Sequence, residues 1–177
     1  MMDLRTTAAA CLVAMIVMAG PHTLRAQTPT SGWQPDLAAW GSVGVGSGSI
    51  SGIAGVSREN ISVGPVLLSV RQTDIGPFIS AGPGVRDNGV LFGVRTGGHR
   101  LFGSGALGYS RATPFHQCDT CGYTTTGATE SGLAYDFMLH ANALVPGLAA
   151  SFSGVIGSQR INYSAFTIGV ELGWFGR

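Results

Sequence analysis

The last apolar segment of the chain constrains the fold most strongly. Between Ser164 and Trp174, large apolar side chains occupy every second position, and small or polar residues occupy the positions between them. Successive side chains of a β-strand point to opposite faces, so the segment predicts a strand with one apolar and one small or polar face. A soluble β-sandwich and a membrane β-barrel both contain such strands, so other features of the chain must distinguish them.

The N-terminus predicts export. A charged start that includes Arg5 precedes an apolar stretch at 8–20, which is shorter than the roughly 20 residues of a membrane-spanning helix. We expect residues 1–26 to be a cleaved signal peptide, residues 27–36 a short periplasmic lead, and residues 37–177 one β-barrel domain. A retained membrane anchor or a buried helix is the alternative for the apolar stretch.

The composition favours a membrane protein over a secreted globule. Charged residues make up 11% of the chain, against about a quarter in ordinary soluble domains. Without Arg5, Arg25 and Asp3 of the expected signal, the ten basic and nine acidic residues balance to no net charge. No basic tract is present, so the sequence does not predict binding to nucleic acid.

Alternating runs of strand length continue through the chain and are separated by Gly, Pro, Asn and Asp. Most have about 9–11 residues, the length of a tilted strand that crosses a bilayer. The expected connections are short at 96–99 and 145–148 but long at 73–87 and 112–130, which is the asymmetry of outer-membrane barrels. The eight expected strands are 37–47, 50–58, 62–72, 88–96, 100–112, 131–142, 147–158 and 162–175.

These features together resemble the small eight-stranded outer-membrane β-barrel proteins of Gram-negative bacteria. The residues that carry the resemblance are the leader at 1–26, the alternating strands, the unequal connections and the aromatic end of the last strand. The resemblance implies an all-β, antiparallel up-and-down transmembrane barrel in the outer membrane, in contact with lipid and lipopolysaccharide. It also implies recognition of the last strand by the assembly machinery, although Trp174 and Phe175 are followed here by Gly176 and Arg177.

The face opposite the apolar one contains charged residues, which we expect inside the barrel. The interior of an eight-stranded barrel is just wide enough for its own side chains, and ionised groups there must pair. We therefore predict an interior polar network, with a proton relay or a catalytic site as the alternative. Its expected members are Arg71, Arg95, Asp136, His140 and Glu171.

Two cysteines, Cys118 and Cys121, follow His116 in the expected loop 112–130. In an exported protein we expect them to form a disulfide with each other. A metal site that includes His116 and a redox-active pair are the alternatives, but neither a fourth ligand nor a thioredoxin-like context is visible in the sequence. We expect no metal and no cofactor.

Several aromatic residues lie near the expected strand ends. Amphipathic rings are enriched at the two membrane–water boundaries, so these residues are expected to form an aromatic girdle. Core or surface positions in a soluble barrel are the alternative. The residues are Trp40, Tyr109, Tyr135, Tyr163 and Trp174.

These features favour a monomeric outer-membrane barrel, without an open pore, that acts structurally or through its extracellular loops. A secreted soluble barrel with a small apolar ligand is one alternative. A lipid A–modifying enzyme that uses His140 or His116 is another, although the sequence contains no nucleophile elbow and no metalloprotease helix.

Overall fold

The structure is a computed structural model. It describes residues 36–50, 52–77, 81–98, 100–118, 124–142, 146–157 and 161–175. These residues belong to one compact unit, Pro35–Arg177, and the other unit, Met1–Gln34, is outside the described residues together with the expected signal peptide. Within the described part of the chain, no helix is long and apolar enough to cross a membrane.

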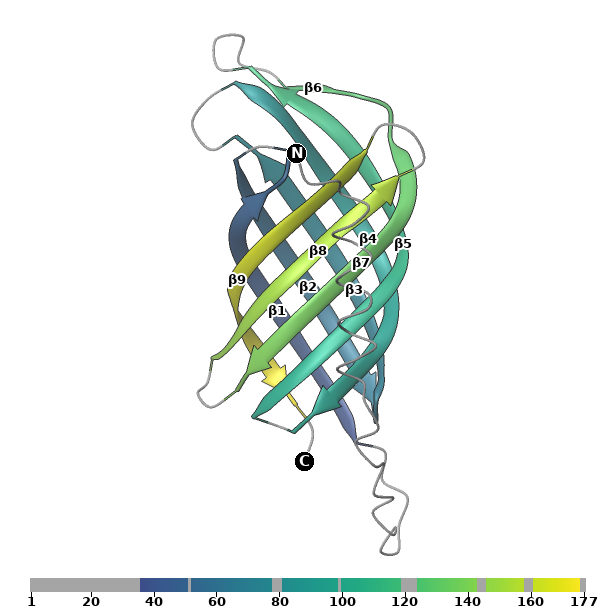
Figure 1. The fold of residues 1–177 in the computed structure, drawn as a ribbon, viewed down its shortest axis with the longest axis vertical. Coiled ribbons are helices and arrows are strands. Elements are labelled where there is room, and N and C mark those ends of the chain that lie inside the picture. Colours follow the sequence, from purple (N-terminus) through teal and green to yellow (C-terminus); the bar gives the residue numbers. More distant parts are fainter. Residues whose placement is uncertain are drawn as a thin grey trace, which may run out of the picture. The chain divides into compact units, whose positions relative to one another are not determined.

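Eight antiparallel strands form a closed barrel, and each pairs with its neighbours in the chain (Figure 1). Pairing of β1 with β9 closes the ring, which confirms the fold class predicted from the sequence. A ninth short strand, β6, pairs only with the end of β5. The strands are β1 (Leu37–Gly48), β2 (Ile53–Val63), β3 (Val66–Gly76), β4 (Gly82–Gly97), β5 (Leu101–Gln117), β6 (Thr124–Thr126), β7 (Glu130–Ala141), β8 (Gly147–Gly157) and β9 (Asn162–Trp174).

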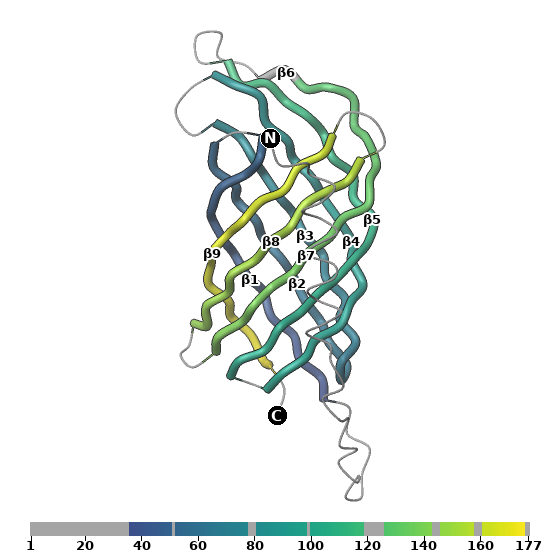
Figure 2. Tube along the Cα trace, viewed as in Figure 1, coloured from purple at the N-terminus to yellow at the C-terminus, as the bar shows by residue number. Residues whose placement is uncertain are grey.

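The strands cross the barrel obliquely, as the Cα trace in Figure 2 shows. Following hydrogen-bonded partners once around the barrel from Leu37 leads back to β1 at Ser47, ten residues further along. Strand number and stagger together set the tilt of a barrel, here roughly 40°. The partners on this path are Val63, Val66, Val94, Gly105, Phe137, Phe152 and Phe166.

The two faces of the wall have the polarity predicted from the alternation. Large apolar side chains point outward, such as Phe92 with 65% of its surface exposed and Phe166 with 52%. Charged and hydroxyl side chains lie inside, where Arg71 and His140 are fully buried. This is the reverse of the arrangement in a soluble barrel that binds an apolar ligand, so the structure contradicts that alternative.

The bounds predicted for the second and third strands are wrong. Outward and inward positions continue to alternate through Val63, and the turn is Gly64–Pro65. Gly64 has a φ of 58°, and Gly is favoured at the first position of a two-residue hairpin turn because it adopts positive φ freely. Its backbone N–H donates to the carbonyl of Asp36 at 2.9 Å.

The predicted long loop 73–87 is also wrong, because β3 and β4 are joined by residues 77–81 alone. Strands β4 and β5 are longer than predicted and remain paired as far as Gly82 and Gln117. Pro83 and Pro114 obscure this extension in the sequence, since proline is typical of sheet edges and loops. The two strand ends together with β6 form an extension beyond the other strands (Figure 1).

The two ends of the barrel differ. The end at which β1 begins and β9 finishes, the turn end, contains the connections 64–65, 98–100 and 142–146. The opposite end, the loop end, contains the connections 49–52, 77–81 and 158–161 and the extension of β4, β5 and β6.

Gly93 on β4 tests how closely the strands approach. A Cβ atom there would overlap the backbone of Gly105 and Ala106 on β5, whereas a Cβ at Gly103 on the same β5 would have its nearest neighbour at 3.8 Å. Gly93→Ala should therefore lower the yield of folded barrel, because backbone cannot move aside as a flexible side chain can. Gly103→Ala should leave it unchanged.

The fraction of protein that changes its electrophoretic mobility on boiling measures folding for both variants. Equal fractions for Gly93→Ala and Gly103→Ala would show that the strands do not approach in this way.

Candidate functional site

The candidate site is the charged interior of the barrel. All five residues predicted for the interior network lie there, with side chains that are buried or nearly so. Two charged residues absent from that prediction, Arg58 and Asp87, are buried with them. Six of these seven residues form three separate clusters, and Arg95 packs beside the third.

The first cluster joins β2 to β7. Arg58 donates through Nε to Oδ2 of Asp136 and through Nη2 to Oδ1 at 3.1 Å, which is a bidentate ion pair. Arg58 Nη2 also donates to Oγ of Ser151 at 2.8 Å, and that hydroxyl lies 2.6 Å from Oγ1 of Thr167. The first cluster therefore connects β2, β7, β8 and β9 across the interior.

The second cluster surrounds Arg71 on β3. Its Nη2 donates to Oδ2 of Asp87 at 2.7 Å, and Ser110 Oγ donates to the same carboxylate oxygen at 2.7 Å. Arg71 also donates to the backbone carbonyls of Tyr135 at 2.7 Å and Gly154 at 3.2 Å. Neither the Arg71 nor the Asp87 side chain is exposed to solvent. Because a single buried charge is costly, each of the two residues neutralises the charge of the other.

The third cluster contains His140 and Glu171, and it lies nearer the turn end. Nδ1 of His140 is 2.7 Å from Oε2 of Glu171, and Nε2 is 2.9 Å from Oγ of Ser104. The ring of Phe102 stacks on the imidazole, with 4.0 Å between the two centroids. Hydroxyl, imidazole and carboxylate are thus connected in the order of a catalytic triad.

Arg95 and three aromatic rings lie beside the third cluster, inside the barrel at the turn end. The Arg95 guanidinium lies 4.3 Å from the ring centroid of Phe102 and 5.7 Å from that of Trp40. It donates to the backbone carbonyl of Phe175 at 2.9 Å, and the Phe175 ring packs against Trp40 at 5.8 Å between centroids. The cation thus lies beside the rings of Phe102 and Trp40 and links side chains of β1, β4 and β5 inside the barrel.

The predicted aromatic girdle is wrong at two positions. Trp40 and Tyr163 point inward and are 3% and 4% exposed, because each lies on the inward-facing register of its strand. Tyr109 and Trp174 point outward, with more than half of each side chain exposed, and Tyr135 packs on the outer wall against Phe152. Proximity to a strand end does not determine the face, whereas the alternation does.

The predicted interior network lacks Arg58 and Asp87 because the predicted strand bounds are wrong. Those bounds place Arg58 at the end of a strand and Asp87 in a loop. Arg58 lies on the same face as the buried Asn60 and Ser62, and the alternation of faces, followed as far as the Gly64–Pro65 turn, identifies it as inward-facing.

The loop-end residues form a separate, exposed group. Cys118 is disulfide-bonded, and Cys121 lies outside the described residues. His116 is exposed, and its Nδ1 lies 3.0 Å from the carbonyl of Gln117. Among the described residues, no group of three or more His, Cys, Asp or Glu side chains is placed to hold a metal ion.

Comparison with solved structures finds the same barrel. Neisserial surface protein A aligns with a TM-score of 0.57 and 11% identity over 77% of this chain and 94% of that protein. The N-terminal β-barrel domain of Pseudomonas aeruginosa OprF aligns with a TM-score of 0.56 and 9% identity over 78% and 98%. Ail, the attachment invasion locus protein of Yersinia pestis, aligns with a TM-score of 0.52 and 11% identity over 78% and 100%.

The fold is that of the small eight-stranded outer-membrane β-barrels. The resemblance inferred from the sequence is thereby confirmed at the level of the fold. No family model and no curated protein matches the chain.

The Arg58–Asp136 pair allows a direct test of the interior network. Asp136→Asn leaves a buried guanidinium without its counter-charge, which should lower the free energy of unfolding by about 3–5 kcal/mol. Asp74→Asn is the matched control, because it removes the partner of Arg86 from a pair whose side chains are 44% and 58% exposed. That change should cost less than about 1 kcal/mol.

Urea unfolding in lipid vesicles, followed by tryptophan fluorescence, measures both variants. Replacing both partners, as in the double variant Arg58→Met, Asp136→Leu, should restore part of the loss, because no unpaired charge remains buried. An equal, small effect of Asp136→Asn and Asp74→Asn would contradict a buried ion pair.

Proposed function

We propose that this chain is an integral protein of the bacterial outer membrane, closed to solutes, that interacts with a surface partner through its loop end. The outward apolar wall is the observation that carries the proposal. Side chains such as Val45, Leu101 and Ile168 are each about 60% exposed. Transfer of such a side chain from water to hydrocarbon contributes about 1.5–3 kcal/mol when it is complete, so a bilayer stabilises this wall and water does not.

The filled interior supports a structural or binding role over transport. Three clusters and the aromatic rings at the turn end connect opposite walls, and an eight-stranded barrel leaves little space beyond its side chains. The barrel then serves as a rigid support for whatever its loop end binds.

The loop end supports the binding part of the proposal. The paired ends of β4 and β5 and the added strand β6 extend beyond the other strands and present exposed polar residues such as His116, Gln117 and Thr126. In outer-membrane barrels the short turns face the periplasm, which would place this extension outside the cell. With the strand bounds of the structure in place of the predicted loops, the proposed binding segments are the connection 77–81 and the extension of β4, β5 and β6 up to residue 129.

The outer wall and the last strand support the proposal that the chain also contacts membrane lipid and the assembly machinery. The apolar faces of all eight strands would contact outer-membrane lipid and lipopolysaccharide. Strand β9 ends with Trp174 outward, whereas Phe175 packs inside the barrel. The outward row that ends at Trp174 would therefore be the surface that the assembly machinery recognises.

Cysteine labelling in intact cells tests the location and the orientation. Thr126→Cys at the loop end should react with a membrane-impermeant maleimide, and Gly98→Cys at the turn end should react only after the cells are permeabilised. Both positions are exposed, so a difference between them reports the side of the membrane. The unmodified protein is the control, because any labelling of it measures the reaction of the native cysteines with the maleimide. Equal labelling of both variants, or release of the protein by a carbonate wash, would contradict the proposal.

A second candidate function is hydrolysis of an acyl ester, as in an enzyme that modifies lipid A. The arrangement of Ser104, His140 and Glu171 is the specific observation in its favour. In such a reaction His140 would take the proton of the attacking Ser104 hydroxyl and deliver it to the leaving alcohol. Against this candidate, His140 and Glu171 have no exposed side-chain surface, and the Phe102 ring covers the imidazole.

An alkyl fluorophosphonate probe distinguishes the two functions, because an activated serine forms a covalent phosphonate with loss of fluoride. We expect no labelling of Ser104 in the folded protein, because the His140 pair is enclosed. Labelling that is lost in both Ser104→Ala and His140→Gln, together with an altered lipid A composition, would instead establish the enzyme.

A further inference from the structure

One ionisable side chain lies on the outside of the barrel, within the apolar wall. Glu59 on β2 is exposed, and its partners in the neighbouring strands are Gly41 of β1 and Val70 of β3. Along β2 the outward Ile61 and Val63 lie between Glu59 and the turn end, and the outward Ile53 lies between Glu59 and the loop end. Glu59 is therefore inside the apolar belt and not at its edge.

A carboxyl group at this depth calls for a partner outside the barrel. At 3.3 Å per residue, Glu59 lies about 13 Å along the tilted strand from Val63, too far from the turn end for its short side chain to reach water. Charged side chains on the lipid face destabilise a barrel most at the bilayer midplane, and acidic residues do so less than basic ones. Ionisable residues in such positions are typical of contacts with another group.

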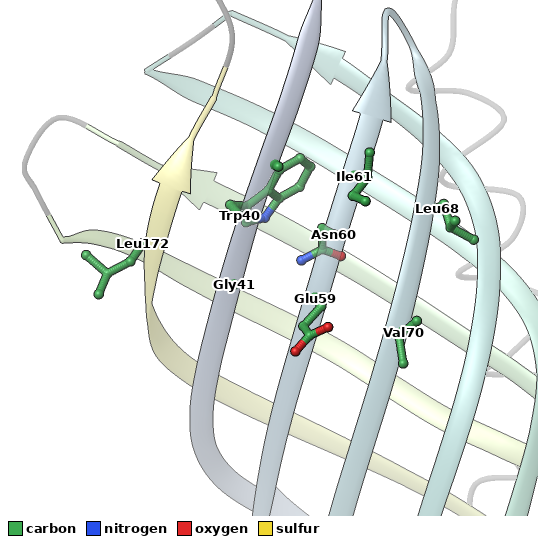
Figure 3. A pocket seen from close by; sticks show the side chains of 9 residues that line it. Trp40, Gly41, Glu59, Asn60, Ile61, Leu68, Val70 and Leu172 are labelled. Carbon is green, nitrogen blue, oxygen red and sulfur yellow. The ribbon is translucent and has the colours of Figure 1, made fainter.

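The wall around Glu59 is hollowed. Two adjoining hollows of about 380 Å³ and 490 Å³ lie over β9, β1, β2 and β3, the larger also reaches Asn88 of β4, and Glu59 borders both. Figure 3 shows the smaller one, with Glu59 among Ile61, Leu68 and Val70. Small residues make the wall shallow here, since the outward positions beside Glu59 include Gly41 and Ser57.

The outer wall of β7, β8 and β9 differs from this patch. Aromatic rings cover it on β7, β8 and β9, at Tyr135, Phe137, Phe152 and Phe166. Small residues allow two membrane proteins to approach closely, and a polar side chain between them can then be shielded from lipid. The wall of β1–β3 therefore has the properties of a contact surface between proteins.

We propose that the wall of β1–β3 is the interface between two copies of this chain in the membrane. The proposal rests on the membrane location proposed above and replaces the monomer expected from the sequence. Two copies that insert in the same direction are related by a two-fold axis along the membrane normal, so each residue meets residues at its own depth. Glu59 then meets Glu59 of the second copy.

The chemistry of Glu59 fits this self-pairing. A protonated carboxyl group both donates and accepts, so two of them form a pair of hydrogen bonds without an opposite charge. The two hollows face each other in such a dimer and enclose the pair.

Thiol crosslinking in membranes tests the interface. Ser57→Cys, outward and beside Glu59, should give a species of twice the mass with a short bifunctional maleimide. Leu139→Cys is the matched control, because Leu139 is 56% exposed on β7 and lies away from the proposed interface, so it should give no more dimer than the unmodified protein. If Ser57→Cys folds poorly, Gly55→Cys replaces it, since a Cβ at Gly55 has its nearest neighbour at 3.9 Å.

A second change separates specific pairing from random collision. In the Ser57→Cys protein, Glu59→Gln should retain the crosslink because an amide pairs with itself, and Glu59→Leu should abolish it. No dimer from Ser57→Cys or Gly55→Cys, or a crosslink to a protein of another mass, would overturn the proposal. The maleimide labelling of Thr126→Cys shows separately whether the chain is inserted, so a failed dimer and a failed membrane location are distinguishable.

Discussion

Closure of the eight strands is the constraint on which the rest of the structure depends. Once the sheet closes with a ten-residue stagger, every second side chain must enter an interior whose width is fixed by strand number and tilt. Charges that enter this interior cannot reach bulk water and must be neutralised within it. The same closure removes the open edges at which another sheet could add, and it turns the apolar half of every strand outward.

The interior clusters connect parts of the chain that are distant in sequence. Arg58 and Asp136 are separated by 78 residues, and Arg71 reaches the carbonyl of Gly154 across 83 residues. The first and second clusters therefore form only when strands from both halves of the chain are in register. Because a one-residue slip would exchange the two faces of a strand, these pairs and the apolar wall select the same register. The outward Glu59, which lies among apolar neighbours, departs from this division of faces and is the basis of the proposed dimer interface.

The fold and the faces of most strands could be predicted from alternation, because side-chain direction has period two in any strand. Glu171 and Asp136 were placed inside the barrel on this basis. The strand ends could not be predicted as well. Gly64–Pro65 was not recognised as the hairpin turn, and the prolines concealed the pairing of the β4–β5 extension. Both errors removed an ionic residue, Arg58 or Asp87, from the predicted interior. The sequence also does not predict which interior charges pair with each other, because the pairs depend on the stagger of the closed barrel.

The central claim is that hydrocarbon contacts the outward side chains of β9 while its inward side chains are enclosed. Nitroxide labels on single cysteines at Ala165, Phe166, Thr167, Ile168 and Val170, read by collision with dissolved oxygen in lipid vesicles, test it most directly. Labels at Phe166, Ile168 and Val170 should show high oxygen accessibility, and labels at the inward Ala165 and Thr167 should show low accessibility. Equal accessibility at all five positions, or the opposite alternation, would contradict the account.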